Sequence, residues 1–201
     1  FYKVVCAYML WAINNNKYEV LVHKMERLLR KNGIKEINIS AAGGPCLARG
    51  LANRVHTSVV FANSDIKIAN SIAQLVSTDY YHVFTSDDVI GVEICSAIKN
   101  LYSMIIGSGE GLNTASVLFR NSISEMVYLT KFFKGKEETV FGLAGLGDLY
   151  VSALGGRNSK MGKHLGKGFT YKKAKKKFMP NDTIEGAQLA FNIAPYILKK
   201  I

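Results

Sequence analysis

The feature that most constrains the fold is a change of pattern near Ser86. Before that residue, short β-branched segments alternate with helical ones, and after about residue 90 no segment has the pattern of a strand. Alternating strands and helices are typical of an α/β layer, so the sequence predicts an α/β part over residues 1–86 and an all-helical part over residues 87–201. No Pro/Gly/Ser-rich linker separates them, and we expect the two parts to pack together.

Periodicity and turn residues give the expected elements. The first part opens on an apolar segment, residues 1–13, which we expect to be a buried strand. It continues with strands at 37–40, 57–62 and 80–84, a tight turn at 41–45, and helices at 18–31 and 65–76. The second part has long helices at 86–107 and 113–133 and shorter ones near 145–152, 158–165, 171–178 and 183–198. The chain is therefore expected to be mostly helical.

Composition excludes several classes of protein. The 201 residues are 48% hydrophobic, which excludes a disordered chain. The apolar start is shorter than the ~20 residues that span a bilayer, so we expect no membrane segment. Three cysteines, Cys6, Cys46 and Cys95, form no C-x-x-C pair and predict no disulfide scaffold, which favours the cytoplasm. The chain starts without an initiator region, and we expect it to be the back part of something longer.

A net charge of +11 raises the question of anionic partners. The densest basic stretch, KKAKKKF at residues 172–178, has the pattern of an amphipathic helix with a solvated face. No nucleic-acid-binding motif accompanies it, so nucleic acid is not an expected partner, although charge alone leaves that alternative open. The four histidines show no metal-ligand spacing with each other or with the cysteines, and we expect no metal site.

Lys99 is the first candidate for chemistry. It lies in the middle of the apolar helix expected from residue 86, within a stripe of small and polar positions at helical spacing: Val92, Ser96, Lys99, Asn100 and Ser103. An ammonium buried without a partner tends to lose its proton, and an unprotonated lysine can act as a general base. A lysine that extends its ammonium to water from a half-exposed face is the alternative.

A second candidate is the glycine-rich string from Leu143 to Asn158. Asp148 could pair with a cation such as Lys99 or accept a hydrogen bond from a substrate hydroxyl. Arg157 offers a planar fork that suits a phosphate, and Asn158 or Ser159 could cap the following helix, whose free N–H groups also favour an anion. An ordinary interhelical loop is the alternative. The string is neither the dinucleotide fingerprint nor the elbow of a serine hydrolase.

These residues make the chain similar to the NAD(P)-dependent glycerol-3-phosphate dehydrogenases, from about Gly44 to Ala187. The resemblance rests on the strings GPCLA, DDVIGVEICSAIKN, FGLAGLGDLYVSALGGRN and IEGA. It implies that residues 1–86 are the end of a Rossmann-type domain and residues 87–201 an all-helical domain like the C-terminal domain of 6-phosphogluconate dehydrogenase. It also implies hydride transfer between sn-glycerol 3-phosphate and dihydroxyacetone phosphate, with NAD or NADP as cofactor. A homodimer is compatible with it.

The resemblance also implies roles for single residues. Lys99 would exchange a proton with the C2 oxygen, and Asp148 would share the catalytic site. Arg157 would touch both the substrate phosphate and the cofactor. The further substrate contacts implied are Gly44, Cys46, Ser152 and Asn158, and the further cofactor contacts are Ala48 and Glu185. Cys46 stands where Ser or Thr is usual in the family.

Two departures from the family pattern keep other functions open. The pyrophosphate-binding glycine loop is absent, and the segment Tyr8–Ile13, where the family has a second active-site lysine, contains neither that lysine nor its glycine. A catalytically inactive relative that serves as a phosphate-binding or protein-interaction module is therefore the main alternative. A nucleic-acid binder and a dehydrogenase acting on another acid or alcohol are the others.

Overall fold

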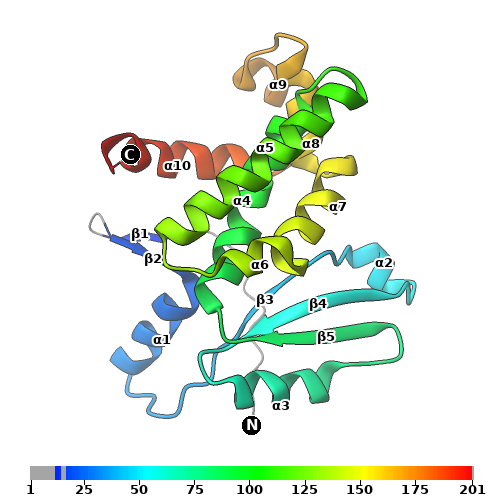
Figure 1. Cartoon of the computed structure of the whole chain (residues 1–201). Coiled ribbons are helices and arrows are strands. Elements are labelled where there is room, and N and C mark those ends of the chain that lie inside the picture. Colours follow the sequence, from blue (N-terminus) through cyan, green and yellow to red (C-terminus); the bar gives the residue numbers. More distant parts are fainter. Residues whose placement is uncertain (1–11, 15–16, 201) are drawn as a thin grey trace.

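The structure, a computed structural model, describes residues 12–14 and 17–200. Figure 1 shows a small sheet below a group of helices. The first part contains β1 (Ala12–Asn14), β2 (Lys17–Glu19), α1 (Leu21–Lys31), β3 (Ala41–Gly43), α2 (Ala48–Ala52), β4 (Thr57–Ala62), α3 (Ile66–Val76) and β5 (Tyr81–Ser86). Most of the predicted strand at 1–13 lies outside the described residues.

The second part is helical throughout its described residues. It contains α4 (Val89–Gly107), α5 (Gly111–Phe132), α6 (Glu137–Phe141), the π-helical turn η1 (Leu143–Gly147), α7 (Asp148–Gly155), α8 (Arg157–Gly166), α9 (Tyr171–Phe178) and α10 (Glu185–Lys200). No strand follows Ser86 within residues 87–200, as predicted. The fold is thus an α/β remnant followed by a helical domain, with α2 and α6 as short helices that the sequence pattern did not indicate.

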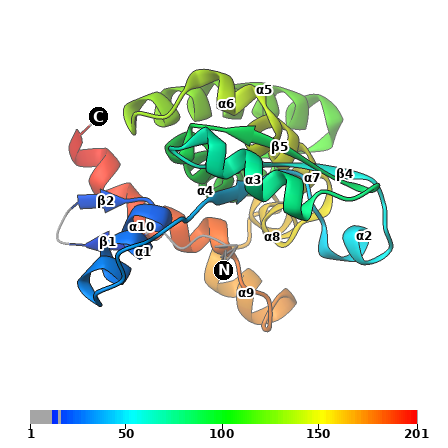
Figure 2. The same cartoon turned by 90° about the horizontal axis from the view of Figure 1, so that it is seen from below.

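The three-stranded sheet has the order β3-β4-β5. β4 runs parallel to β5, with Thr57 opposite Tyr81, and antiparallel to β3, with Ala41 opposite Ala62. Alternate residues of β4 point to opposite faces of the sheet. Val59 and Phe61 pack with Ile72 of α3, whereas Ala62 belongs to the core around α4. Figures 1 and 2 show α3 lying across the sheet on the side away from α4.

Two predicted boundaries in the first part are wrong. The strand expected at 37–40 is found at Ala41–Gly43, where a tight turn was expected. The reason is tertiary: a Cβ on Gly43 would lie 2.5 Å from the Ser96 Oγ, so only a strand of small residues can run this close to α4. The helix expected from residue 18 begins at Leu21, because Lys17–Glu19 form β2 and pair with β1.

Helix α4 is the centre of the molecule. The Asp88 carboxylate caps its first turn by accepting a hydrogen bond from the Gly91 N–H at 2.8 Å, so the helix starts slightly later than predicted. It contacts α5, α7, α8, α10, η1 and β3, and most of its residues are buried. Among the described helices α4 alone is long and apolar enough to cross a membrane, and 67% of its apolar window is buried inside the fold, as in a core helix.

Close helix packing brings the site elements together. A Cβ on Gly162 of α8 would lie 2.0 Å from the Met104 carbonyl oxygen of α4, and one on Gly107 would lie 2.3 Å from the Ser159 carbonyl oxygen. Glycine at both positions therefore lets the two backbones approach directly. This contact holds the first two turns of α8 against the C-terminal end of α4.

Candidate functional site

Lys99 and Asp148 form an ion pair between α4 and α7. The Lys99 ammonium donates a hydrogen bond to the Asp148 Oδ2, and the two side chains are only 17% and 8% exposed. The pairing expected from sequence is therefore present. Burial of both groups excludes most of the water that would otherwise weaken their attraction. A polar pair is thus held in an otherwise apolar interior.

The surroundings of Asp148 act on its pKa in opposite directions. Burial raises the pKa of this carboxyl above its ordinary value, and the positive charge of Lys99 opposes that rise most strongly. The Gly44 backbone N–H and the Ser152 hydroxyl also lower the pKa. Gly44 and Ser152, both predicted substrate contacts, therefore lie beside the carboxylate, which links β3 to α7.

A π-helical turn places Asp148 at the first position of α7. Within that turn Gly145 has no room for a side chain, because a Cβ would lie 2.1 Å from the Val140 carbonyl oxygen. Such turns widen the helix by one residue and often occur at functional sites. The glycine-rich segment LAGLG thus allows the local backbone geometry that directs the Asp148 carboxylate toward α4.

A second polar group lies where α4, α8 and α10 meet. Arg157 donates to the Glu185 Oε1 at 2.6 Å and to the Thr183 carbonyl oxygen at 3.1 Å. The Asn158 amide donates to the Asn100 Oδ1 at 3.2 Å and to the Glu185 Oε2 at 3.3 Å. Asn100 directly follows Lys99 on α4, so this network starts one residue along the helix from the Lys99–Asp148 pair.

The members of this network differ in exposure. Asn158 is buried, and its Oδ1 accepts the Gly186 N–H at 2.8 Å, which fixes the start of α10. Arg157 has a side chain that is 55% exposed, and only two of its five N–H donors are used by Glu185 and Thr183. The guanidinium therefore has donors left for an anionic ligand.

The predicted cap of α8 is wrong. Gly156, not Asn158 or Ser159, is the residue at the cap position, and it makes no side-chain cap bond. The Asn158 side chain is occupied by contacts with α4 and α10, and the Ser159 Oγ donates to the Ala153 carbonyl oxygen at 2.7 Å. Asn100 was expected only as a member of the polar stripe on its helix, and its hydrogen bond with Asn158 was not predicted.

The loop after β3 is only partly joined to this group. Gly44 has a φ of +128°, and its carbonyl oxygen accepts the Cys46 N–H at 2.8 Å. Burial raises the pKa of the Cys46 thiol, a nearby Thr57 hydroxyl opposes this, and the Asp148 charge adds to the rise. Cys46 is thus close enough to Asp148 for the carboxylate charge to act on its thiol. Ala48 is exposed at the start of α2, and no hydrogen bond in the described chain ties it to the group.

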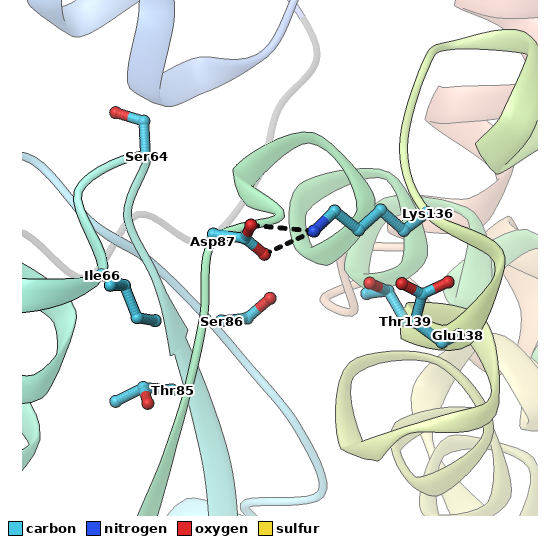
Figure 3. A pocket seen from close by; sticks show the side chains of 8 residues that line it. All are labelled: Ser64, Ile66, Thr85, Ser86, Asp87, Lys136, Glu138 and Thr139. Atoms are coloured by element: carbon cyan, nitrogen blue, oxygen red, sulfur yellow. Dashed lines mark hydrogen bonds and ion pairs between the residues drawn. The ribbon is translucent and has the colours of Figure 1, made fainter.

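A pocket of about 420 Å³ opens elsewhere, between the ends of β4 and β5 and the segment that enters α6. Figure 3 shows its lining side chains, with the Lys136 ammonium bonded to both oxygens of Asp87 at 2.7 and 2.8 Å. None of the predicted site residues lines it. Serine and threonine hydroxyls and the carboxylate of Glu138 complete its polar wall.

Two of the four histidines lie close together in the fold. The His56 Nδ1 and the His82 Nε2 lie 3.2 Å from each other, and both residues are exposed, a pairing that the sequence spacing gave no reason to expect. Within the described residues, no group of three or more His, Cys, Asp or Glu side chains is arranged to hold a metal ion.

Comparison with known proteins identifies what this arrangement resembles. Residues 88–200 match the family model described as the C-terminus of NAD-dependent glycerol-3-phosphate dehydrogenase. An NADP(+)-dependent glycerol-3-phosphate dehydrogenase of Archaeoglobus fulgidus is 37% identical over 153 residues, which cover 72% of this chain and 45% of that protein. A glycerol-3-phosphate dehydrogenase [NAD(P)+] of Clostridium acetobutylicum is 36% identical over 137 residues, 65% of this chain and 41% of that protein.

Solved structures agree with the sequence comparison. The crystal structure of glycerol-3-phosphate dehydrogenase from Coxiella burnetii matches 88% of this chain and 55% of its own, with a TM-score of 0.77 and 28% identity. The Plasmodium falciparum enzyme, at 21% identity and a TM-score of 0.83, shares the fold over 94% of this chain and 54% of its own. The chain spans less than half the length of the curated relatives it matches.

Proposed function

Because the chain belongs to the NAD(P)-dependent glycerol-3-phosphate dehydrogenase family, we propose that the complete protein interconverts dihydroxyacetone phosphate and sn-glycerol 3-phosphate with NAD(P)H. The observation that carries the proposal is the buried Lys99–Asp148 pair. The next residue of α4, Asn100, accepts a hydrogen bond from Asn158, which directly follows the partly exposed Arg157. One end of this arrangement can move a proton and the other can bind a phosphate. These are the two protein tasks in this reaction.

The chain supplies part of a dinucleotide site. Its sequence has no glycine-rich pyrophosphate loop, and the residues that fit the cofactor are Arg157 and Glu185, where the exposed guanidinium is open to a ligand. Ala48, exposed at the start of α2, is the third proposed contact. When bound, NAD(P)H supplies the hydride that reduces C2. Which of the two dinucleotides is used depends on residues that bind the adenosine ribose.

Lys99 is the proposed proton donor and acceptor at the C2 oxygen. In the reducing direction its ammonium gives a proton to the oxygen as the carbonyl becomes an alcohol, and in the oxidising direction its amine takes that proton back. Asp148 holds the ammonium in place and stabilises its charge. With the side chains 17% and 8% exposed, little water competes for the proton.

Arg157 is the proposed phosphate anchor. A guanidinium binds phosphate oxygens through parallel N–H groups, and Glu185 and the Thr183 carbonyl oxygen orient its plane. Fixing the phosphate fixes the distance of C2 from Lys99, which is the positioning part of catalysis. Asn158, Ser152, Gly44 and Cys46 are the further proposed substrate contacts.

The remaining proposals concern organisation. We place the domain boundary between residues 86 and 87, which is supported by the end of β5 at Ser86 and the start of the family match at residue 88. Cys46 and Cys95 are free thiols in the structure, which supports a location in the reducing cytoplasm. A small-molecule substrate follows from the proposed reaction. A homodimer and the lack of nucleic-acid and membrane binding remain predictions.

The proposal is tested by NADH or NADPH oxidation in the complete protein supplied with dihydroxyacetone phosphate or with unphosphorylated dihydroxyacetone. We expect a strong preference for the phosphorylated substrate. Arg157→Gln should raise the KM for it by roughly 10- to 100-fold, which corresponds to losing hydrogen bonds to a charged group. Arg120→Gln, at an exposed arginine of α5, is the matched control and should leave the KM unchanged.

Two results would contradict the proposal. A wild-type protein without activity, but with measurable binding of inorganic phosphate, would favour the inactive phosphate-binding module. Equal rates with and without the substrate phosphate would favour a dehydrogenase for another alcohol.

A further inference from the structure

One buried carboxylate joins the two segments that carry the proposed catalytic pair. The Asp88 Oδ1 accepts the Gly91 N–H at 2.8 Å, and the Oδ2 accepts the Lys136 N–H at 2.8 Å and the Thr139 hydroxyl at 2.6 Å. Asp88 is 6% exposed. We name this set of three contacts the Asp88 clamp. It connects the first turn of α4 to the first turn of α6.

Each end of the clamp leads directly to a member of the pair. Lys99 lies about three turns further along α4, a helix whose rigid backbone transmits any shift of its first turn. From α6 the chain passes through η1 to Asp148 at the start of α7. The clamp therefore fixes the separation of two elements whose side chains must meet.

The backbone packs closely around the Asp88 clamp and restricts the movement of its carboxylate. A Cβ on Gly91 would lie 1.8 Å from the Asp88 Oδ2, and a Cβ on Gly135 would lie 2.7 Å from the Gly91 Cα. The Asp88 N–H is also held, because it donates to the Ser86 Oγ at 3.0 Å. The carboxylate thus has one geometry in which all of its partners are satisfied.

The chemistry of the clamp requires a carboxylate. Three donors converge on its two oxygens, so an amide at this position would have to direct its own N–H₂ group at one or two of these donors. A neighbouring ion pair gives a natural comparison, since Asp87 and Lys136 span the same contact at the surface, as Figure 3 shows. Side chains that are 58% and 46% exposed make this outer pair weakly coupled to the fold.

We propose that Asp88 is a positioning residue, which sets the distance between Lys99 and Asp148 by locking the start of α4 to the start of α6. It touches neither substrate nor cofactor. The inference rests on the proposed function, and it adds a residue to the reaction that lies outside the site described above.

The experiment compares Asp88→Asn, Thr139→Val and the control Asp87→Asn in the complete protein, below the melting temperature of each. We expect Asp88→Asn to lower kcat by roughly 10- to 100-fold, because displacements of about 1 Å have effects of that size, while the KM for dihydroxyacetone phosphate stays nearly unchanged. Thr139→Val removes one donor and should give a smaller fall in kcat. Asp87→Asn should behave as the wild type.

Lower melting temperatures with unchanged kcat in both Asp88→Asn and Thr139→Val would overturn the inference, because Asp88 would then be merely structural. If Asp88→Asn does not fold, the kcat of Thr139→Val decides. If the wild-type protein has no activity, the proposed function fails, and crystal structures decide the inference. It then requires the Lys99 Nζ and Asp148 Oδ2 to separate in Thr139→Val and to stay bonded in Asp87→Asn.

Discussion

Lys99 and Asp148 are 49 residues apart in the sequence and hydrogen-bonded in the fold. Each is held by a different device, a long core helix for the lysine and a π-helical turn for the aspartate. The pair exists only because α4 and α7 pack directly on each other. Stability of this packing and function of the pair are therefore tied together.

A buried glutamate on the same helix predicts a pH-dependent stability. Burial raises the pKa of Glu93 to about 7, although its oxygens accept the Val22 N–H at 3.1 and 3.4 Å. Because the pKa of Glu93 is higher in the folded state than its ordinary value of 4.5, the protonated side chain stabilises the fold fully at a pH below 4.5. This contribution to stability is lost as the pH rises through 7. The loss is on the order of 3 kcal/mol.

Glu93→Gln should remove this decline, because the amide keeps an acceptor for Val22 and cannot ionise. Urea unfolding at about pH 5 and about pH 8 measures it. Glu138→Gln, at an exposed glutamate, is the control that should retain the wild-type pH dependence. A wild-type protein that is equally stable at both values, or a Glu93→Gln variant with the same decline, would refute the prediction.

Ser96 predicts an unusual gain in stability. Among the described residues, its Oγ is the one buried side-chain polar atom without a hydrogen-bond partner. Ser96→Ala removes that unsatisfied group and should raise the free energy of unfolding by about 1 kcal/mol. Ser122→Ala is the opposite control, since the buried Ser122 Oγ donates to the Leu118 carbonyl oxygen at 2.7 Å and its loss should destabilise by a similar amount. A change in the free energy of unfolding in the same direction for both variants would contradict this account.

The contact between α4 and α8 predicts that alanine is tolerated at one glycine of the helical part and not at another. Gly162→Ala should destabilise the protein by about 1–3 kcal/mol, because its Cβ would collide with the Met104 carbonyl oxygen of α4. Gly155→Ala, in α7, meets nothing within 4 Å and should be neutral or slightly stabilising through helix propensity. Thermal unfolding of the two variants measures the difference, and a Gly162→Ala variant as stable as the wild type would show that the helices can separate without cost.

The helices of the second part could be predicted because their signals are local. Apolar spacing located α4, and α9 matched its predicted range, with Ala174 buried and most of its lysines exposed. The position of β3 could not be predicted in this way. Ala41–Gly43 form a strand because β4 lies beside them and Ser96 lies above them, and neither neighbour is visible in the local sequence.

Within the candidate site, one contact could be predicted from the sequence and others could not. The sequence allows Asp148 to pair with Lys99, and the structure shows that ion pair. Asn158 was expected to cap α8, yet its amide is taken by Asn100, Glu185 and the Gly186 N–H, contacts that depend on three helices meeting. The Asp88 clamp was invisible for the same reason, because two of its donors come from a segment about 50 residues away.

The measurement that tests the central claim most directly is the rate of NAD(P)H oxidation by the complete protein in its Lys99→Arg variant. Arginine can keep the ion pair with Asp148 but does not release its proton in a protein, so the variant separates proton transfer from structure. We predict a fall in kcat of roughly 10²- to 10⁴-fold with an unchanged melting temperature, and wild-type activity in the control Lys136→Arg. A Lys99→Arg variant with nearly the wild-type kcat would contradict the assignment of Lys99 as the proton donor.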